Sequence, residues 1–235
     1  VFINGRFSEK LSRAQELPAG MTVMSLRDAM DSDRFGALAR EQLDHILNEQ
    51  KDIFIALNTA FSQYSLFLHS DKNVVCEKPI YILHLSANEE TPVLNSHMNL
   101  AIAETGSQFA YIEGQFEMPG AEGAYFNKSL KWVMGKDIAH VYHYCLQKEV
   151  AEGYIINNVD AEQGRDSTFS NYTLDLGGRM VRNNLNTLHK GSNLTTNYYG
   201  IYFGKDKQHI DNHTFIDHAV PHCQSNEMYK GIVTD

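Results

Sequence analysis

The chain has 235 residues, of which 43% are hydrophobic and 21% charged, and its formal net charge is −9. This apolar share is ordinary for a globular protein and is enough for a packed core. The acidic balance argues against a nucleic-acid partner, because phosphate binding needs a basic surface.

Three cysteines stand far apart in the sequence, at Cys76, Cys145 and Cys223. An odd number of cysteines, with no C-x-x-C pair among them, does not form a disulfide framework. This cysteine usage indicates a reducing compartment. No apolar run approaches the roughly 18 residues of a membrane helix. We therefore expect a cytoplasmic protein without a membrane partner. Because the chain begins with Val1 rather than Met, we also expect a fragment of a longer protein.

The first third of the chain has helical periodicity. Residues 1–8 predict a β-hairpin around an Asn-Gly turn, and residues 25–31 predict a short helix that opens with a capping box. Apolar residues recur at steps of three and four over residues 35–47, and a second helix is predicted over residues 52–61. We predict a small α-helical N-terminal region over residues 1–72 that starts with the hairpin.

The apolar period changes from 3.6 to 2 after this region, which predicts strands. In the last part of the chain, short apolar runs alternate with corners rich in Asn, Asp and Gly, without clean two-residue hairpins. The glycines assigned to corners are Gly191, Gly200, Gly204 and Gly231. We predict a right-handed parallel β-helix over residues 73–235. Its strands would have about five residues, its repeat about 20–25 residues, and residues 97–235 would form about six coils.

One candidate metal site lies on a predicted strand. His209, Asp211 and His213 alternate, so that they share one face of the strand. Ile210 on the other face should point into an apolar interior, which directs the three outward. Two imidazoles and a carboxylate could hold a divalent metal there. A hydrogen-bonded ladder between coils is the alternative.

A second, looser group of candidate ligands consists of His218, His222 and Cys223. Pro221 interrupts the strand, so the directions of these side chains stay open. Cys223 could be a thiolate ligand or a half-buried structural residue.

Other patterns give no catalytic or nucleotide site. His140 and His143 fall on opposite faces of one strand, which argues against a joint metal site. A P-loop-like run from Gly200 is one residue short, and Asp206 takes the place of the Mg²⁺-binding Ser or Thr. We therefore expect no enzymatic activity and no stably bound cofactor.

Several longer motifs carry a family resemblance. They are A-H-V-Y-H-Y (139–144), R-x-N-L (182–185), Q-H-I-D-x-H-T (208–214), D-H-x-x-P-H-C-x-S (217–225) and Y-K-G-I (229–232). Together they resemble the SufB/SufD family of the SUF iron–sulfur cluster assembly system, and the last two are closer to the SufD members. Nearly the whole chain can be aligned in this way.

The resemblance implies a non-enzymatic scaffold subunit of the SUF complex. Such a subunit pairs with SufB through its β-helix and with the SufC ATPase through a C-terminal helical domain. An iron–sulfur cluster or iron would be held transiently in the assembled complex. The family continues past residue 235, so the β-helix of this chain is expected to be incomplete at its C-terminus. The alternative from another class is a secreted β-helix enzyme that acts on acidic polysaccharide.

Overall fold

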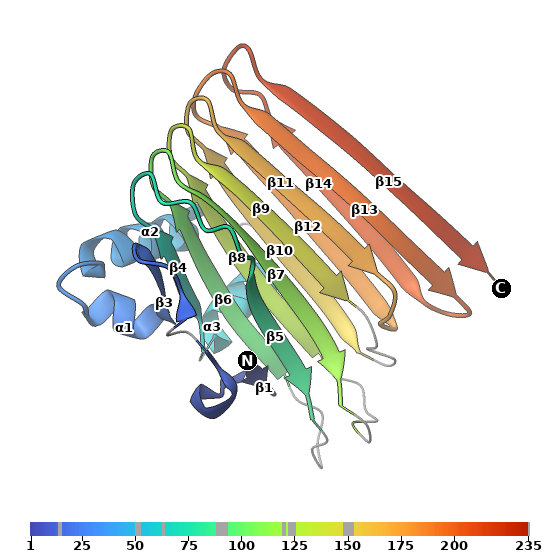
Figure 1. The fold of residues 1–235 in the computed structure, drawn as a ribbon. Coiled ribbons are helices and arrows are strands. Elements are labelled where there is room, and N and C mark those ends of the chain that lie inside the picture. Colours follow the sequence, from blue (N-terminus) through green and yellow to red (C-terminus); the bar gives the residue numbers. More distant parts are fainter. Residues whose placement is uncertain are drawn as a thin grey trace.

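The computed structural model describes residues 1–13, 16–49, 53–62, 64–87, 94–118, 121, 126–147 and 153–234. Two long sheets face each other, and a helical layer covers one of them at one end (Figure 1). The helices are η1 (Glu9–Leu11), α1 (Leu26–Asp31), α2 (Gly36–Glu49) and α3 (Ile53–Phe61). In the described residues, no helix has the length and apolarity needed to cross a bilayer.

From β4 (Leu66–Ser70) onward, the strands alternate between the two sheets along the chain. The strands are β1 (Phe2–Ile3), β2 (Arg6–Phe7), β3 (Met21–Ser25), β4 (Leu66–Ser70), β5 (Ile80–Ser86), β6 (Leu94–Ala103), β7 (Gln108–Glu117), β8 (Phe126–Gly135), β9 (His140–Gln147), β10 (Tyr154–Gln163), β11 (Thr168–Asp175), β12 (Met180–His189), β13 (Thr195–Lys205), β14 (His209–Asp217) and β15 (Gln224–Thr234). The even strands from β4 to β14 form one parallel stack, and the odd strands from β5 to β15 form the other.

This arrangement is a flattened β-solenoid, which confirms the predicted mainly β, β-helical fold. The prediction of about six coils was too high, because strands β6 to β15 make about five turns. The repeat is longer than expected: paired residues are 26 positions apart between Tyr154 and Met180, and 32 apart between Leu94 and Phe126. The strands of these coils have 8 to 11 residues rather than about five.

Three glycines that the sequence assigned to corners lie inside strands instead. Gly200 and Gly204 belong to β13, and Gly231 belongs to β15, whereas Gly191 does lie between β12 and β13. A Cβ atom on Gly200 would overlap the ring of Tyr229 on the next strand. Gly231 is related to the ring of Tyr202 in the same way. These glycines make room for tyrosine rings rather than for turns.

The corners repeat a different feature. Once in each coil a residue takes a left-handed backbone conformation, with φ between 59° and 71°, at Asn73, Gly106, Ile138, Asp166, Asn193 and His222. In the first four of these residues, the backbone N–H donates to a carbonyl of the next coil, as from Asn73 to Thr105 (2.9 Å) and from Ile138 to Arg165 (2.8 Å). The corner therefore depends on backbone geometry that several residue types adopt, Ile138 at a steric cost.

Antiparallel strands close the N-terminal end of both sheets. The Asn-Gly turn of the β1–β2 hairpin has positive φ at both residues, which confirms the predicted hairpin. β1 pairs in parallel with β5, and β3 pairs antiparallel with β4. Because β4 already pairs in parallel with β6, the parallel stack begins within residues 1–72.

The helices pack on the outer face of the even-numbered sheet, as the apolar periodicity of residues 35–47 requires. Phe35, Ala39 and Ile46 are buried against a group of side chains from β4 and β6. This group consists of Phe67, Met98, Leu100 and Ile102. Ser25 caps the predicted short helix, since Ser25 Oγ accepts from the Asp28 N–H at 3.0 Å, which is one of the two bonds of a capping box. Asp52, at the predicted start of the next helix, lies outside the described residues.

The interior between the sheets has an apolar part and a polar part. Phe109, Val141, Phe169, Leu185 and Tyr198 are buried in the apolar part. Farther along the same strands, the inward positions carry carboxylate, imidazole and amide side chains, so the interior is less apolar than expected. Such groups need internal partners, because burial removes their water.

Candidate functional site inside the solenoid

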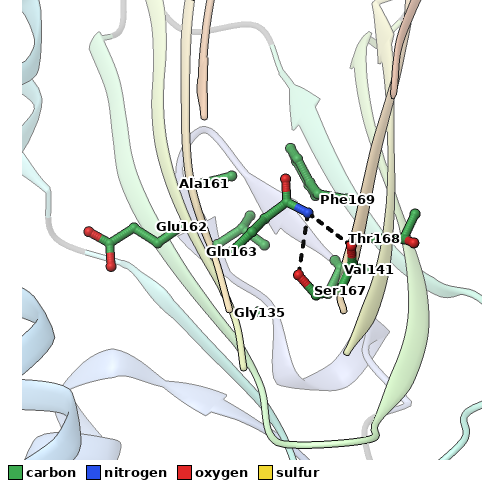
Figure 2. A pocket seen from close by; sticks show the side chains of 9 residues that line it. Gly135, Val141, Ala161, Glu162, Gln163, Ser167, Thr168 and Phe169 are labelled. Carbon is green, nitrogen blue, oxygen red and sulfur yellow. Dashed lines mark hydrogen bonds between the residues drawn. The ribbon is translucent and has the colours of Figure 1, made fainter. Parts of the chain in front are cut away.

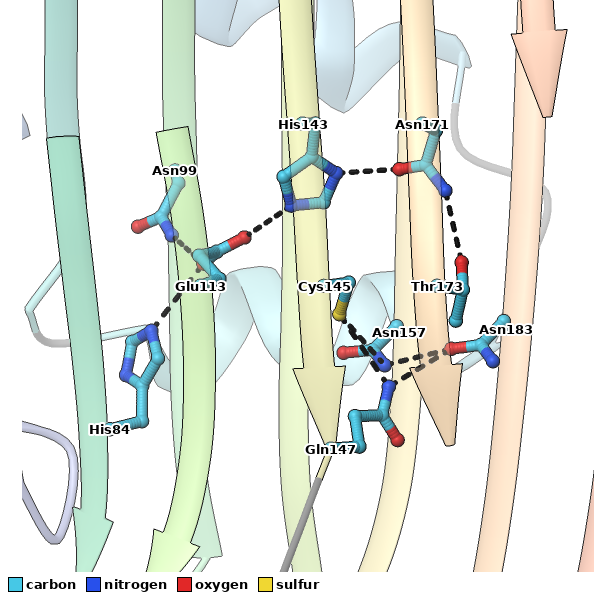
Figure 3. Close-up of polar contacts among 10 residues, drawn as sticks. All are labelled: His84, Asn99, Glu113, His143, Cys145, Gln147, Asn157, Asn171, Thr173 and Asn183. Carbon is cyan, nitrogen blue, oxygen red and sulfur yellow. Dashed lines mark hydrogen bonds and ion pairs between the residues drawn. The ribbon is translucent and has the colours of Figure 1, made fainter. Parts of the chain in front are cut away.

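Glu113 of β7 is the centre of the polar interior (Figure 3). Its side chain is 2% exposed, and it faces the imidazole of His143 on β9, which is fully buried. Glu113 Oε2 lies 3.0 Å from His143 Nε2, and Glu113 Oε1 accepts from Asn99 Nδ2 at 2.8 Å. His84 Nε2 of β5 lies 3.4 Å from the same Oε1 atom. The carboxylate thus links side chains from both sheets.

The opposite nitrogen of His143 also faces an acceptor. Its Nδ1 atom lies 2.6 Å from Asn171 Oδ1, and the Asn171 amide donates to Thr173 Oγ1 at 3.0 Å. The ring therefore has a polar partner at each nitrogen, a carboxylate oxygen on one side and an amide oxygen on the other. Such internal partners are what buried polar groups require.

The ring of Tyr111 stacks on the ring of His143, with the ring centroids 4.5 Å apart. Its complete burial, and secondarily the charge of Glu113, raise the pKa of Tyr111 well above its ordinary value. The phenol is therefore neutral at any physiological pH. The Tyr111 ring thus provides an uncharged surface that packs against His143, the partner of Glu113.

A second network continues the polar path toward the later coils, with Asn183 of β12 as its centre (Figure 3). Asn183 Oδ1 accepts from Asn157 Nδ2 at 2.9 Å and from Gln147 Nε2 at 3.1 Å. Asn183 Nδ2 lies 2.9 Å from Asp175 Oδ2 and 2.8 Å from Asn212 Oδ1. These contacts join strands β9, β10, β11, β12 and β14, so hydrogen-bonded side chains connect several successive coils.

His97 of β6 completes a compact group with His84 and Glu113. The two imidazole rings stack with centroids 4.1 Å apart, and Phe2 of β1 covers the His84 ring at 5.1 Å. One donor atom from each of His84, His97 and Glu113 lies within 4.8 Å of the other two. In the part of the chain that the structure describes, no other group of three such ligands is as close.

Two small cavities lie in the interior. One adjoins His84 and His97 and is otherwise lined by Gly5, Leu85, Ser86, Asn95 and Gln115. The other lies at the opposite end of the strands, where the Gln163 amide hydrogen-bonds to Ser167 at 3.4 Å (Figure 2). Each has a volume of about 10 Å³, which is the space of a single water molecule. Neither of the two can admit a sugar ring.

The first set of sequence-predicted ligands lies on the outer face of β14, as expected. His209 and His213 are exposed, whereas Ile210 is half-buried on the inner face. Asp211 Oδ1 lies 2.8 Å from His213 Nε2, and Asp211 Oδ2 lies 3.5 Å from Arg182 Nη1 of the neighbouring strand. The structure thus pairs Asp211 with a histidine and across coils with an arginine, and His209 does not join this pair. The metal role of the three residues stays a prediction.

The second predicted set lies at the corner between β14 and β15. His218 Nε2 lies 3.1 Å from Ser225 Oγ, and its ring lies 4.6 Å from that of the buried His189. His222 occupies the left-handed corner position, and the Cys223 thiol lies 3.6 Å from the carbonyl of Gly191. The structure does not gather His218, His222 and Cys223 around one point.

The group formed by His84, His97 and Glu113 was not predicted from the sequence. His140 and His143 do lie on opposite faces of β9, as predicted: His140 is half-buried and His143 fully buried. The partner of His143 is 30 positions away in sequence, on the adjacent strand. Polar residues at inward-facing strand positions were the only sign of this group in the sequence. Their spacing along the chain does not show which of them meet.

Two family models match consecutive parts of the chain. The SufBD protein N-terminal region matches residues 1–82, and the SufBD core domain of SUF system FeS cluster assembly matches residues 84–235. The boundary between the two falls inside β5, which is the first strand of the odd-numbered parallel stack.

Among curated proteins, the chain is similar over its whole length to an iron–sulfur cluster assembly SufBD family protein of Synechocystis (26% identical) and to the iron–sulfur cluster assembly protein SufD of Escherichia coli (25% identical). It covers 52% of each of these proteins, so the chain spans about half of their length. A SufBD family protein of Mycobacterium leprae is 38% identical over 68 residues, which are 29% of this chain and 17% of that protein. With both family models matched end to end, the chain belongs to the SufBD family of iron–sulfur cluster assembly proteins.

Proposed function

We propose that this chain is part of a SufD-type scaffold, a non-enzymatic subunit of a SUF assembly complex in the cytoplasm. The observation that carries the proposal is the match of both family models over residues 1–82 and 84–235. The similarity to SufD of Escherichia coli over the full chain supports the SufD assignment within the family.

The expected partners are SufB, through the β-helix, and the SufC ATPase, through a helical domain beyond these residues. Large apolar side chains are exposed on strands β13 to β15, at the end of the stack opposite the helices. They are Ile201, Phe215, Met228, Ile232 and Val233. Exposed apolar surface of this kind marks a face that is covered in the assembled protein. Further coils of the full-length subunit would cover it first, and SufB would pair beyond them.

In this proposal iron and sulfide are the cargo of the assembly reaction. They are held transiently in the assembled complex, while the solenoid supplies a rigid frame. A scaffold needs neither a large cleft nor a catalytic group, which fits two interior cavities of about 10 Å³.

The test is co-expression of the full-length gene product with the SufB and SufC homologues of the same organism. The expected result is one complex on size-exclusion chromatography that contains all three subunits and acquires iron and sulfide on reconstitution. An unrelated β-helix protein in place of the full-length product is the matched control, and it should elute separately.

Separate elution of the full-length product, with cluster assembly by SufB and SufC unchanged in its absence, would overturn the proposal. So would release of unsaturated oligosaccharides from polygalacturonate by the purified product, which is the activity of a polysaccharide lyase.

A further inference from the structure

We propose that His84, His97 and Glu113 bind one divalent transition-metal ion inside the first coils of the solenoid. The site would be a resident metal site of this chain, separate from the transient cargo of cluster assembly. It does not depend on the proposed partners, because the three ligands come from β5, β6 and β7 of this chain.

The distances between the donor atoms support the proposal. All three lie within 4.8 Å of one another, whereas three ligands of one zinc-like ion, each at about 2.0–2.2 Å, are about 3.3–3.8 Å apart. Movement of the donor atoms by up to about 1 Å, through rotation of the side chains, closes that gap. The rings of His84 and His97 are 14° from parallel, so one of them must also tilt to direct its lone pair at the ion.

The donor set selects the class of metal. Two imidazole nitrogens and one carboxylate oxygen suit Zn²⁺, Fe²⁺ or Co²⁺, and a site with two histidines and one carboxylate leaves further positions open. Mg²⁺ and Ca²⁺ prefer oxygen ligands alone. We therefore expect first-row transition metals to bind and alkaline-earth ions to be rejected.

The carboxylate is already oriented by its neighbours. His143 Nε2 contacts Glu113 Oε2 at 3.0 Å, and Asn99 donates to Oε1 at 2.8 Å. Ligand carboxylates in metal sites usually have such hydrogen-bonded support, which fixes their direction. A bound ion would replace the longer contact of 3.4 Å between His84 Nε2 and Glu113 Oε1.

A further ligand of the ion also has a place beside the two histidines. The cavity of about 10 Å³ that adjoins His84 and His97, though not Glu113, has the size of one water molecule, so it can hold a water that completes the coordination of the ion. The hairpin residue Gly5 lines this cavity, and Phe2 of the same hairpin stacks on His84. The hairpin covers the site, and an ion in it would join strands of the two sheets.

The experiment is titration of the chelator-treated chain with Co²⁺, followed by visible absorption, and with Zn²⁺ by calorimetry. We expect one ion per chain in both titrations and no binding of Mg²⁺. Glu113→Gln keeps the shape of the side chain but removes a charged ligand, and it should weaken binding by more than about 100-fold. His143→Gln removes a side chain that supports Glu113 without being a proposed ligand, and it should weaken binding by about 10- to 100-fold.

Two further variants separate ligation from folding. His84→Cys replaces one ligand by another, so it should retain Co²⁺ and add a thiolate-to-cobalt charge-transfer absorption in the near ultraviolet. His140→Ala, on the face of β9 opposite His143, is the matched histidine control and should bind as the unchanged chain does. Failure of the unchanged chain to bind Co²⁺ or Zn²⁺ would overturn the proposal. So would unchanged affinity in Glu113→Gln, absence of the thiolate band in Co²⁺-loaded His84→Cys, or loss of binding in His140→Ala.

Discussion

The ring of Tyr229 on β15 occupies the space above Gly200 on β13, where any other residue would place its Cβ atom. The two residues are paired in the parallel register. Gly200 is therefore required by the packing of a neighbouring strand, because only a residue without a Cβ atom leaves room for the Tyr229 ring.

Gly200→Ala should lower the free energy of unfolding by roughly 1–3 kcal/mol, because the added methyl group displaces the Tyr229 ring. Gly204→Ala on the same strand is the matched control, since its Cβ would lie 3.7 Å from the nearest atom. Thermal unfolding followed by circular dichroism measures both. Equal midpoints for the two variants would contradict this account.

Ile138→Asn should stabilise the protein by about 1 kcal/mol. Ile138 has a φ of 60°, which a β-branched residue adopts only with strain and which Asn tolerates. The side chain is 48% exposed, so little buried surface is lost. Chemical denaturation measures the change, and Ile201→Asn, at an exposed position within strand β13, should give no stabilisation. A lower midpoint for Ile138→Asn would show that the corner is not strained.

His189 should make the protein less stable in mild acid. Burial, and secondarily the charge of nearby His218, lower the pKa of His189 to about 4, against a partly opposing effect of Asp217. The unfolded chain has the ordinary value of about 6.5 and binds the proton first. The contribution of neutral His189 is therefore complete above pH 6.5 and is lost as the pH falls toward 4, by at most about 3 kcal/mol.

The measurement for His189 is the free energy of unfolding between pH 7 and 4 for the unchanged chain and for His189→Gln. The difference between the two should change across this range, because the variant has no imidazole to protonate at that position. Parallel curves would contradict the assignment.

The three cysteines should differ in their reaction with a thiol reagent. Cys223 is partly exposed, whereas Cys76 and Cys145 are buried, and burial also raises the pKa of Cys76. We expect one fast thiol in the native chain and two more only after denaturation. Cys223→Ser should remove the fast phase. Fast reaction of two or three thiols in the native chain would show that the interior opens readily.

The order of elements was predictable because it rests on local periodicity. The spacing of Phe35, Ala39 and Ile46 predicts the buried face of α2, and Asn-Gly predicts the first hairpin. The length of the repeat was not predictable in this way. It depends on strands of up to 11 residues, in which Gly200 and Gly204 look like breaks although the backbone continues through them.

The interior group was harder to predict for a physical reason. Glu113 of β7 meets His84 because β5 pairs with β7, and it meets Asn99 because β6 of the opposite sheet faces it across the interior. Such contacts depend on which strands are neighbours and on which residues are aligned, and no local pattern contains either. By contrast, His209, Asp211 and His213 drew attention because their alternation is visible in the sequence, yet only two of them meet.

The antiparallel pairings of β2 and β3 affect the register of the strands in the solenoid. Each coil is aligned with the coil before it through paired strands such as β10 and β12. The first alignment is set where β1 meets β5 and where β3 meets β4, beside the helical layer. A slip of one residue there would turn every inward side chain of the next strand outward, and the strands that pair with it would be misaligned in turn. The pairing of the N-terminal strands thus sets the register of the strands that follow.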